Sequence, residues 1–277
     1  MAFRDPGSTP GLTQNSDLPR IGVLCLDEAV PRELPRGTLV DPSLFKGPVT
    51  ARKVPGASLE AVLDHPEQVA DRYLEIALET IADGANTIVS NCGYTIVMQD
   101  DLAKRCNAEV VTSSLCSLPG LLSGTRDGLS IAVLCFDANR LTNSHLESAE
   151  VDPRDERIGL FGLEGSETWR KALQPAGYYD WSQMAKDLSV TCRAISARRE
   201  RFASLLIECC AFLPFADDIA RATGLPTLDL RDTIEAAASD AIRRAVDHGQ
   251  PSEPFGRLEM TNESAFGRPL LPAPPPA

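Results

Sequence analysis

The sequence predicts an α/β fold of two similar halves, each with a parallel β-sheet flanked by helices. Short apolar runs, typical of buried strands, alternate along the 277 residues with stretches that have helical spacing. Strands that alternate with helices favour a parallel sheet with right-handed crossovers. Two of the runs end in similar motifs, Asn91-Cys92-Gly93 and Glu208-Cys209-Cys210, about half the chain apart. Each motif resembles the same structural feature in one of two similar halves.

The first half contains three expected strands, at residues 21–26 (IGVLCL), at 87–90 (TIVS) and around Val110. The Pro- and Gly-punctuated segment 27–56 is expected to be a long loop, and loops of that length are usually functional. A helix is expected from Ser58, which can cap it, through residue 81, with Gly84 ending it. Another helix is expected over roughly 94–106.

The second half repeats this alternation. Expected strands lie at 129–136 (LSIAVLCF), 158–163 (IGLFGL), 204–207 (SLLI) and 227–230 (TLDL), with a long amphipathic helix over about 181–199. A helix is expected after the second cysteine motif, and a final one runs to about residue 246. Residues 1–19 are expected to form a flexible tail and 249–277 a Pro-rich C-terminal tail.

The composition excludes several classes of protein. Apolar residues make up 43% and charged residues 24%, as in ordinary globular proteins. The net charge of −12 argues against a nucleic-acid partner, which would need a basic surface. No apolar run approaches a membrane span and no secretory signal is visible, so a cytoplasmic location is expected. The eight scattered cysteines are expected to be free thiols.

The two strand-end cysteines suggest acid–base chemistry. Ligands of parallel sheets bind beyond the carboxyl ends of the strands, where Cys92 and Cys209 are expected. Inverting a carbon next to a carboxylate requires one group on each face, and a thiol with a pKa of about 8.5 suits both roles. Helix N-terminal N–H groups would lower the thiol pKa and bind a carboxylate, and Gly93 would permit close approach of a ligand.

The same residues also have a purely structural interpretation. Spacing alone favours the interpretation that both cysteines are core residues that follow apolar strands. Asn91 would then be a turn former, and Ser113 and Ser114 would be loop residues or helix caps.

Several segments resemble the aspartate/glutamate racemase superfamily. TIVSNCGYTIVMQ (87–99), VVTSSL (110–115) and LLIECCAFLPFADDI (205–219) are similar to its two cysteine regions. RIGVLCLD (20–27), VPGAS (54–58) and AVLCFDANRLTNSHL (132–146) resemble an incompletely characterised branch of it. The resemblance implies two pseudo-twofold-related α/β domains, 20–117 with 225–248 and 118–224, and an active site in the interdomain cleft.

The resemblance also implies roles for individual residues. Cys92 and Cys209 would be the acid and base, and the carboxylate would be held by Asn91, Gly93, Tyr94, Ser113 and Ser114. Asp27 and Arg32 would orient the substrate or a cysteine, and Cys210 and Ala211 would contribute backbone N–H groups. Cys210 and Ala211 replace a usual Thr and a usual polar residue, which favours a less polar substrate. The doublet leaves two registers open, and the spacing to Pro214 favours Cys209.

The expected function is a cofactor-independent racemase or epimerase of an amino acid or related carboxylate. No P-loop or G-x-G-x-x-G motif is present, and the three histidines, at 65, 145 and 248, lack metal-ligand spacing, so neither cofactor nor metal is expected. Alternatives within the superfamily are a hydantoin racemase, a maleate-type isomerase and an arylmalonate-type decarboxylase. A non-catalytic carboxylate-binding protein is a further alternative. The expected partner is a small carboxylate, with a homodimer as an option.

Overall fold

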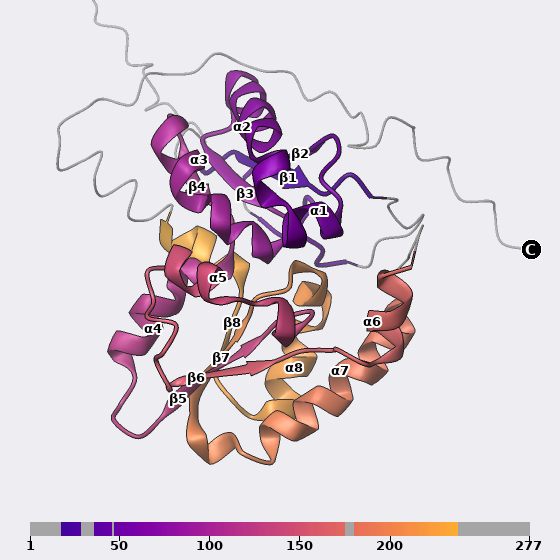
Figure 1. Ribbon diagram of the computed structural model, residues 1–277, viewed down its shortest axis with the longest axis vertical. Helices are drawn as coiled ribbons and strands as arrows, with labels where there is room; N and C mark the ends of the chain where they lie inside the picture. Colours follow the sequence, from indigo (N-terminus) through magenta and orange to yellow (C-terminus); the bar gives the residue numbers. More distant parts are fainter. Residues whose placement is uncertain (1–17, 29–35, 46, 175–179, 238–277) are drawn as a thin grey trace, which may run out of the picture.

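The chain folds into two four-stranded parallel sheets, one in each half (Figure 1). The computed structural model describes residues 18–28, 36–45, 47–174 and 180–237. The first sheet has the strand order β2-β1-β3-β4 and the second the order β6-β5-β7-β8. Every strand pair is parallel. The identical order confirms the predicted α/β fold of two similar halves.

The first sheet contains a strand that the sequence pattern did not predict. Its members are β1 (Ile21–Cys25), β2 (Val49–Lys53), β3 (Thr87–Ser90) and β4 (Glu109–Val111). Strand β2 lies inside the segment 27–56 that was expected to be a loop, and it pairs with β1 in the register Ile21↔Val49. Its sequence, VTARK, is polar and only partly buried because it forms the edge of the sheet, so it lacks the apolar run of a central strand.

The helix expected over residues 58–81 is divided in two. Helix α1 (Leu59–Asp64) begins at Ser58, whose side chain accepts a hydrogen bond of 3.0 Å from the Ala61 N–H, as predicted. Pro66 then starts α2 (Pro66–Ala82). Proline lacks the N–H that would continue α1 and holds the preceding residue, His65, out of the helical conformation, but it fits the first turn of a new helix.

Three short helices and α3 complete the first half and lead into the second. The 3-10 helix η1 (Gly93–Met98) continues into α3 (Gln99–Arg105), and η2 (Ser114–Ser117) continues into α4 (Leu118–Gly124). The predicted helix over roughly 94–106 is therefore confirmed, although its first turns have 3-10 geometry.

The second half builds its sheet from β5 (Ser130–Leu134), β6 (Ile158–Phe161), β7 (Phe202–Ile207) and β8 (Thr227–Leu228). Its helices are η3 (Ala138–Arg140), α5 (Asn143–Ser148), α6 (Glu167–Ala172), α7 (Trp181–Ser196), η4 (Arg199–Arg201), η5 (Cys210–Phe215) and α8 (Ala216–Thr223). Helix α7 buries Met184, Leu188, Cys192 and Ile195, which lie on one helical face.

The last strand differs from the expectation that segment 225–248 returns to the first domain. Strand β8 pairs with β7 of the second sheet, in the register Leu205↔Thr227. It holds the place that β4 holds in the first sheet, so each half completes its own sheet. The return begins only afterwards: Leu230 and Ile234 pack in the same apolar cluster as Ile21 of β1. Residues 238–248 lie outside the described part of the chain.

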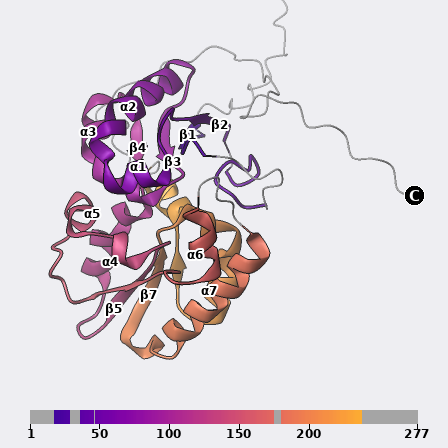
Figure 2. The ribbon, with the colours of Figure 1, turned by 45° about the vertical axis from the view of Figure 1, so that its right-hand side comes forward.

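The two halves pack directly against each other. One apolar cluster joins residues of both sheets, including Leu24 and Ile88 from the first and Ile131 and Leu206 from the second. Figures 1 and 2 place α2 and α3 on the outside of the first half, and α6 and α7 on the outside of the second. The carboxyl ends of β3 and β7 lead into residues at the contact between the halves.

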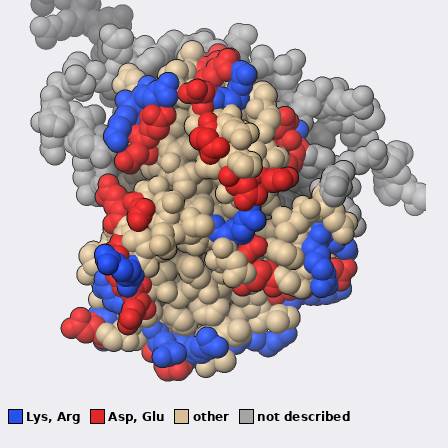
Figure 3. Space-filling view, in the orientation of Figure 1, with Lys and Arg blue, Asp and Glu red and all other residues tan. Residues whose placement is uncertain are grey.

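The surface carries charges of both signs. On the face seen in Figure 3, Lys and Arg are interspersed with Asp and Glu around a broad uncharged area. Within the described residues, no helix has both the length and the apolar character needed to cross a membrane.

Candidate active site

The two cysteine motifs have the same local structure in the two halves. Strand β3 ends just before Cys92, which caps η1, and η1 continues into α3. Strand β7 likewise precedes Cys209, which caps η5, and η5 continues into α8. Both cysteines are extended, with φ −128° and ψ 112° at Cys92 and φ −78° and ψ 116° at Cys209. Cys209, rather than Cys210, therefore holds the position equivalent to Cys92.

Backbone N–H groups act on the two thiols in an equivalent way. Hydrogen bonds from the backbone of Tyr94 and Thr95 lower the pKa of the Cys92 thiol. Hydrogen bonds from the backbone of Ala211 and Phe212 do the same for Cys209. In both motifs the donors are the second and third residues after the cysteine, because the first turn of a helix leaves its N–H groups free.

The net effect on both thiols is nevertheless upward. Burial, followed by the Glu208 carboxylate, raises the pKa of Cys92 and of Cys209 well above the ordinary value and outweighs the N–H groups. The sequence-based expectation that the helix ends would lower the thiol pKa is therefore wrong in its net direction. Cys92 itself also raises the Cys209 pKa. The two thiols and Glu208 thus lie within electrostatic reach of one another, although they come from different halves.

Glu208 is the main site residue that the sequence analysis missed. It is only 1% exposed, and neither carboxyl oxygen has a hydrogen-bond partner among the described residues. Burial raises the pKa of its carboxyl to about 8. A Cβ atom added to Gly93 would lie 2.2 Å from Glu208 Oε1, so this side chain reaches the Cys92 turn. An acidic residue that directly follows the apolar SLLI strand, next to a candidate cysteine, was the signal available in the sequence.

Two residues expected to hold the carboxylate form hydrogen bonds between the halves. The Tyr94 hydroxyl accepts a hydrogen bond from the Asp137 N–H and donates one to the Asp137 carbonyl, both at 2.8 Å. The Ser114 hydroxyl donates to the Ile207 carbonyl at 2.8 Å. These side chains fix the position of the second half relative to the first, and their hydroxyl protons already have acceptors.

The remaining predicted residues mostly stabilise turns. Asn91 Oδ1 accepts from the Leu26 N–H at 3.0 Å, and Ser113 Oγ accepts from the Leu115 N–H at 3.2 Å. The buried Cys210 thiol donates to the Ser90 carbonyl, with 3.6 Å between sulfur and oxygen.

Two further site residues, Asp27 and Arg32, were expected in the loop after the first strand. Asp27 is exposed, with 3.6 Å between its Oδ1 and Lys53 Nζ. Arg32 lies outside the described residues. The structure therefore brings Cys92, Gly93 and Cys209 together around Glu208.

The described residues near the site include a buried histidine but no group suited to binding a metal ion. His145 is 4% exposed, burial lowers its pKa to about 4, and its ring lies edge-on to Tyr94 with 5.5 Å between centroids. All eight cysteines are free. The described ranges contain no cluster of three or more His, Cys, Asp or Glu residues suited to a metal ion.

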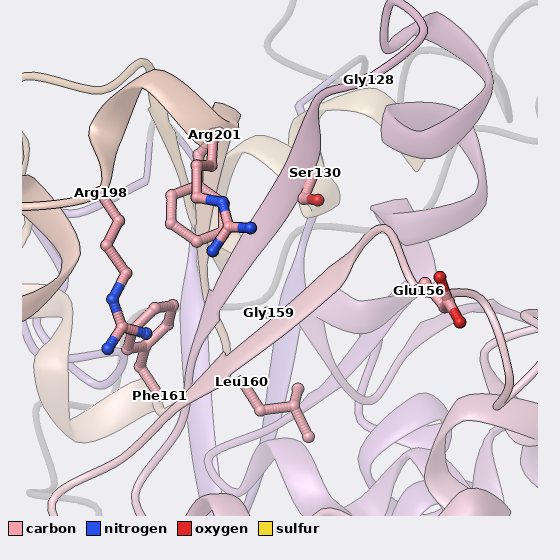
Figure 4. Close-up of a pocket in the computed structure, with 9 residues that line it drawn as sticks. Gly128, Ser130, Glu156, Gly159, Leu160, Phe161, Arg198 and Arg201 are labelled. Atoms are coloured by element: carbon pink, nitrogen blue, oxygen red, sulfur yellow. The ribbon is translucent and has the colours of Figure 1, made fainter.

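A surface pocket of about 350 Å³ lies at the amino ends of strands β5 and β7 in the second sheet (Figure 4). Ser130 and Phe202, at the amino ends of β5 and β7, line it together with Glu156, Arg198 and Arg201. The candidate thiols follow the carboxyl end of β7 and of the corresponding strand β3, so this pocket is separate from them.

Three curated proteins resemble the chain in sequence, and no family model matches it. It is 28% identical over 232 residues to a dimethylsulfoniopropionate lyase of Durusdinium sp. clade D, covering 81% of this chain and 74% of the relative. It is 26% identical over 225 residues to dimethylsulfoniopropionate lyase 7 of Emiliania huxleyi (strain CCMP1516), covering 77% of this chain. The chain spans only 64% of the length of that second relative.

Solved structures with the same architecture are more distant in sequence. Picrophilus torridus aspartate racemase has a TM-score of 0.50 at 13% identity, covering 80% of this chain and 94% of its own. Francisella tularensis glutamate racemase has a TM-score of 0.52 at 10% identity, covering 86% and 85%. A glycine-to-cysteine variant of arylmalonate decarboxylase has a TM-score of 0.50 at 19% identity, covering 86% and 98%. The chain therefore has the fold of the Asp/Glu/hydantoin racemase superfamily.

Proposed function

We propose that this chain is a cofactor-independent enzyme that removes a proton from the carbon next to a carboxylate, with Cys92 and Cys209 as its acid–base pair. The repeated turn, in which a strand end leads through a cysteine into a 3-10 helix in each half, carries this proposal. Thiols contributed by two different halves can approach one carbon from two sides. The N–H groups at the same turns would stabilise the negative charge that develops on the substrate.

Racemisation or epimerisation is the first possible outcome of this step. One cysteine, as thiolate, takes the proton from the α-carbon, and the other, as thiol, delivers a proton to the opposite face. The roles reverse for the other enantiomer. The fold of aspartate and glutamate racemases and the equivalence of the two cysteine turns support this outcome.

β-Elimination is the second outcome, and the sequence likeness to dimethylsulfoniopropionate lyases favours it. On that substrate a thiolate would take the proton from the carbon next to the carboxylate. The electron pair of the broken C–H bond forms the carbon–carbon double bond. The bond from the β-carbon to sulfur breaks with its electrons on sulfur, so a neutral sulfide leaves and an unsaturated carboxylate remains. The two outcomes share their first step.

One experiment on the full chain tests the proposal and separates the outcomes. The purified protein is incubated with dimethylsulfoniopropionate, and volatile sulfide is measured by gas chromatography. In parallel, amino acids, hydantoins and dicarboxylates are incubated in D₂O, and deuterium is measured by mass spectrometry in the separated enantiomers at low conversion. Sulfide release indicates elimination, whereas deuterium confined at first to the product enantiomer indicates two-thiol racemisation. The proposal is overturned if neither assay shows activity, or if the C92S and C209S variants are as active as wild type.

A further inference from the structure

Glu208 is a buried acid with nothing in the described protein to compensate its charge. Its two oxygens have no hydrogen-bond partner within the described residues, and its side chain is 1% exposed. A buried carboxylate normally has a partner, because leaving the ionised form unpaired in the interior costs several kcal/mol. This side chain reaches the turn of one candidate thiol and directly precedes the other.

Within the described part of the chain, the titratable groups that Glu208 acts on are all acids. Its charge acts on the thiols of Cys92, Cys135, Cys209 and Cys210 and on the Tyr94 hydroxyl, and it raises the pKa of each. Among the described residues, Glu208 forms no ion pair, and no Lys or Arg side chain offsets its effect on these five groups. A substrate carboxylate, a thiolate and an ionised Glu208 would together place three negative charges close to one another.

We propose that Glu208 binds a cationic group of the substrate, an ammonium or a sulfonium held next to the reacting carbon, so that the enzyme selects zwitterionic carboxylates. This inference rests on the proposed function and names its substrate class. An onium group would supply the missing countercharge, since neither Glu208 oxygen accepts a hydrogen bond within the described residues. A sulfonium, which cannot donate a hydrogen bond, needs only a carboxylate within reach.

Such a cation would also act on the thiols. An ionised Glu208 disfavours the thiolate forms of Cys92 and Cys209. A bound cation offsets that repulsion. The thiols would therefore ionise more readily when a zwitterion is bound than when none is bound. Substrate selection and activation of the base would then depend on the same carboxyl group.

Binding of matched ligand pairs tests this inference without relying on turnover. Dimethylsulfoniopropionate is paired with 4-methylpentanoate, which replaces the sulfonium sulfur by CH, and glutamate is paired with glutarate. Calorimetry on the full chain is expected to show at least about tenfold tighter binding of the cationic member in one of the two pairs. In E208Q this preference is expected to fall to about twofold or less. The control variant E156Q changes an exposed glutamate that lines the separate surface pocket, and it is expected to keep the preference.

Proton release provides a second measurement that a purely structural role would not alter. Below pH 8 Glu208 is largely protonated, so pairing with a cation should release about one proton per ligand in wild type and none in E208Q. Titrations in buffers of different ionisation enthalpy measure this number. If neither onium-bearing ligand binds better in wild type than its partner without the onium group, the inference fails, whether or not E208Q folds. It also fails if folded E208Q keeps the preference. Tight, charge-selective binding without any turnover would instead contradict only the proposed function.

Discussion

The carboxyl group of Glu208 packs against the backbone of Gly93, so that the second half of the molecule covers the turn that holds Cys92. A Cβ atom at residue 93 would lie 2.2 Å from Glu208 Oε1 and 2.6 Å from the Glu208 carbonyl oxygen. Real Cβ atoms do not approach other heavy atoms this closely, and one of the two obstacles is backbone. Gly93 therefore permits the contact that brings the two cysteine turns together.

Replacing Gly93 by alanine is expected to separate these turns. The G93A variant should lose about 1–3 kcal/mol of unfolding free energy through overpacking, and its turnover should fall at least about tenfold. Urea unfolding and activity assays measure both effects. Gly120 has nothing within 4 Å of its Cβ position, so G120A in helix α4 is the matched control and should be neutral or slightly stabilising. Equal behaviour of the two variants would contradict the close contact.

Serine at either candidate thiol is expected to abolish turnover. C92S and C209S should each lower kcat by about a hundredfold or more, because a hydroxyl is too weak an acid for proton transfer, while circular dichroism stays unchanged. C210S should keep activity, since Cys210 only donates to the Ser90 carbonyl and a serine hydroxyl can replace it. C106S, at the end of α3, is a second control. Loss of activity in C210S with retention in C209S would reverse the assignment of the second thiol.

Removing the charge of Glu208 is expected to make the neighbouring thiols more acidic. At pH 9 the Glu208 carboxyl is ionised and raises the pKa of Cys92 and Cys209. E208Q should therefore react with iodoacetamide at these two cysteines at least about threefold faster than wild type. Peptide mass spectrometry follows each cysteine separately. Cys106, whose pKa Glu208 does not influence, is the internal reference, and a parallel change there would count against the explanation.

Glu208 is also expected to make stability depend on pH. Its folded pKa of about 8 lies above that of an exposed glutamate, so the stability it contributes is fully present below about pH 4 and is lost as the pH rises towards 8. E208Q lacks this loss. From pH 5 to pH 8, the unfolding free energy of wild type should fall relative to that of E208Q by more than about 1 kcal/mol, as measured by urea unfolding. A constant difference between the two proteins would show that Glu208 is already ionised at pH 5.

Phenylalanine at residue 94 separates a structural from a substrate-binding role of Tyr94. Its hydroxyl makes two hydrogen bonds to Asp137, so Y94F should lower the unfolding free energy by about 1–3 kcal/mol. If the hydroxyl only joins the halves, KM for the substrate should change little in folded protein. An increase in KM of tenfold or more, with stability unchanged, would instead support the carboxylate-binding role that the family resemblance implies.

The central strands could be predicted from sequence because their burial makes them continuously apolar. TIVS at 87–90 was predicted with its observed boundaries, and LSIAVLCF contains β5. The edge strand β2 could not be found in this way, because one side of an edge strand faces solvent and its residues VTARK are mostly polar. Pro66 was visible in the sequence and divides α1 from α2, yet the apolar stripe that continues across it favoured one helix.

The sequence by itself determined the α/β fold, its two similar halves and the positions of Cys92 and Cys209 at strand ends, because these depend on local hydrophobic periodicity and on residue type. Only the tertiary structure decided what surrounds the thiols. The sequence shows Glu208 beside a candidate cysteine, but its raised pKa arises from burial at the contact between the halves. Tyr94 and Ser114 likewise donate to carbonyl groups 43 and 93 residues away. Burial and long-range hydrogen bonds arise only when distant segments pack together, so periodicity along the chain carries no record of them.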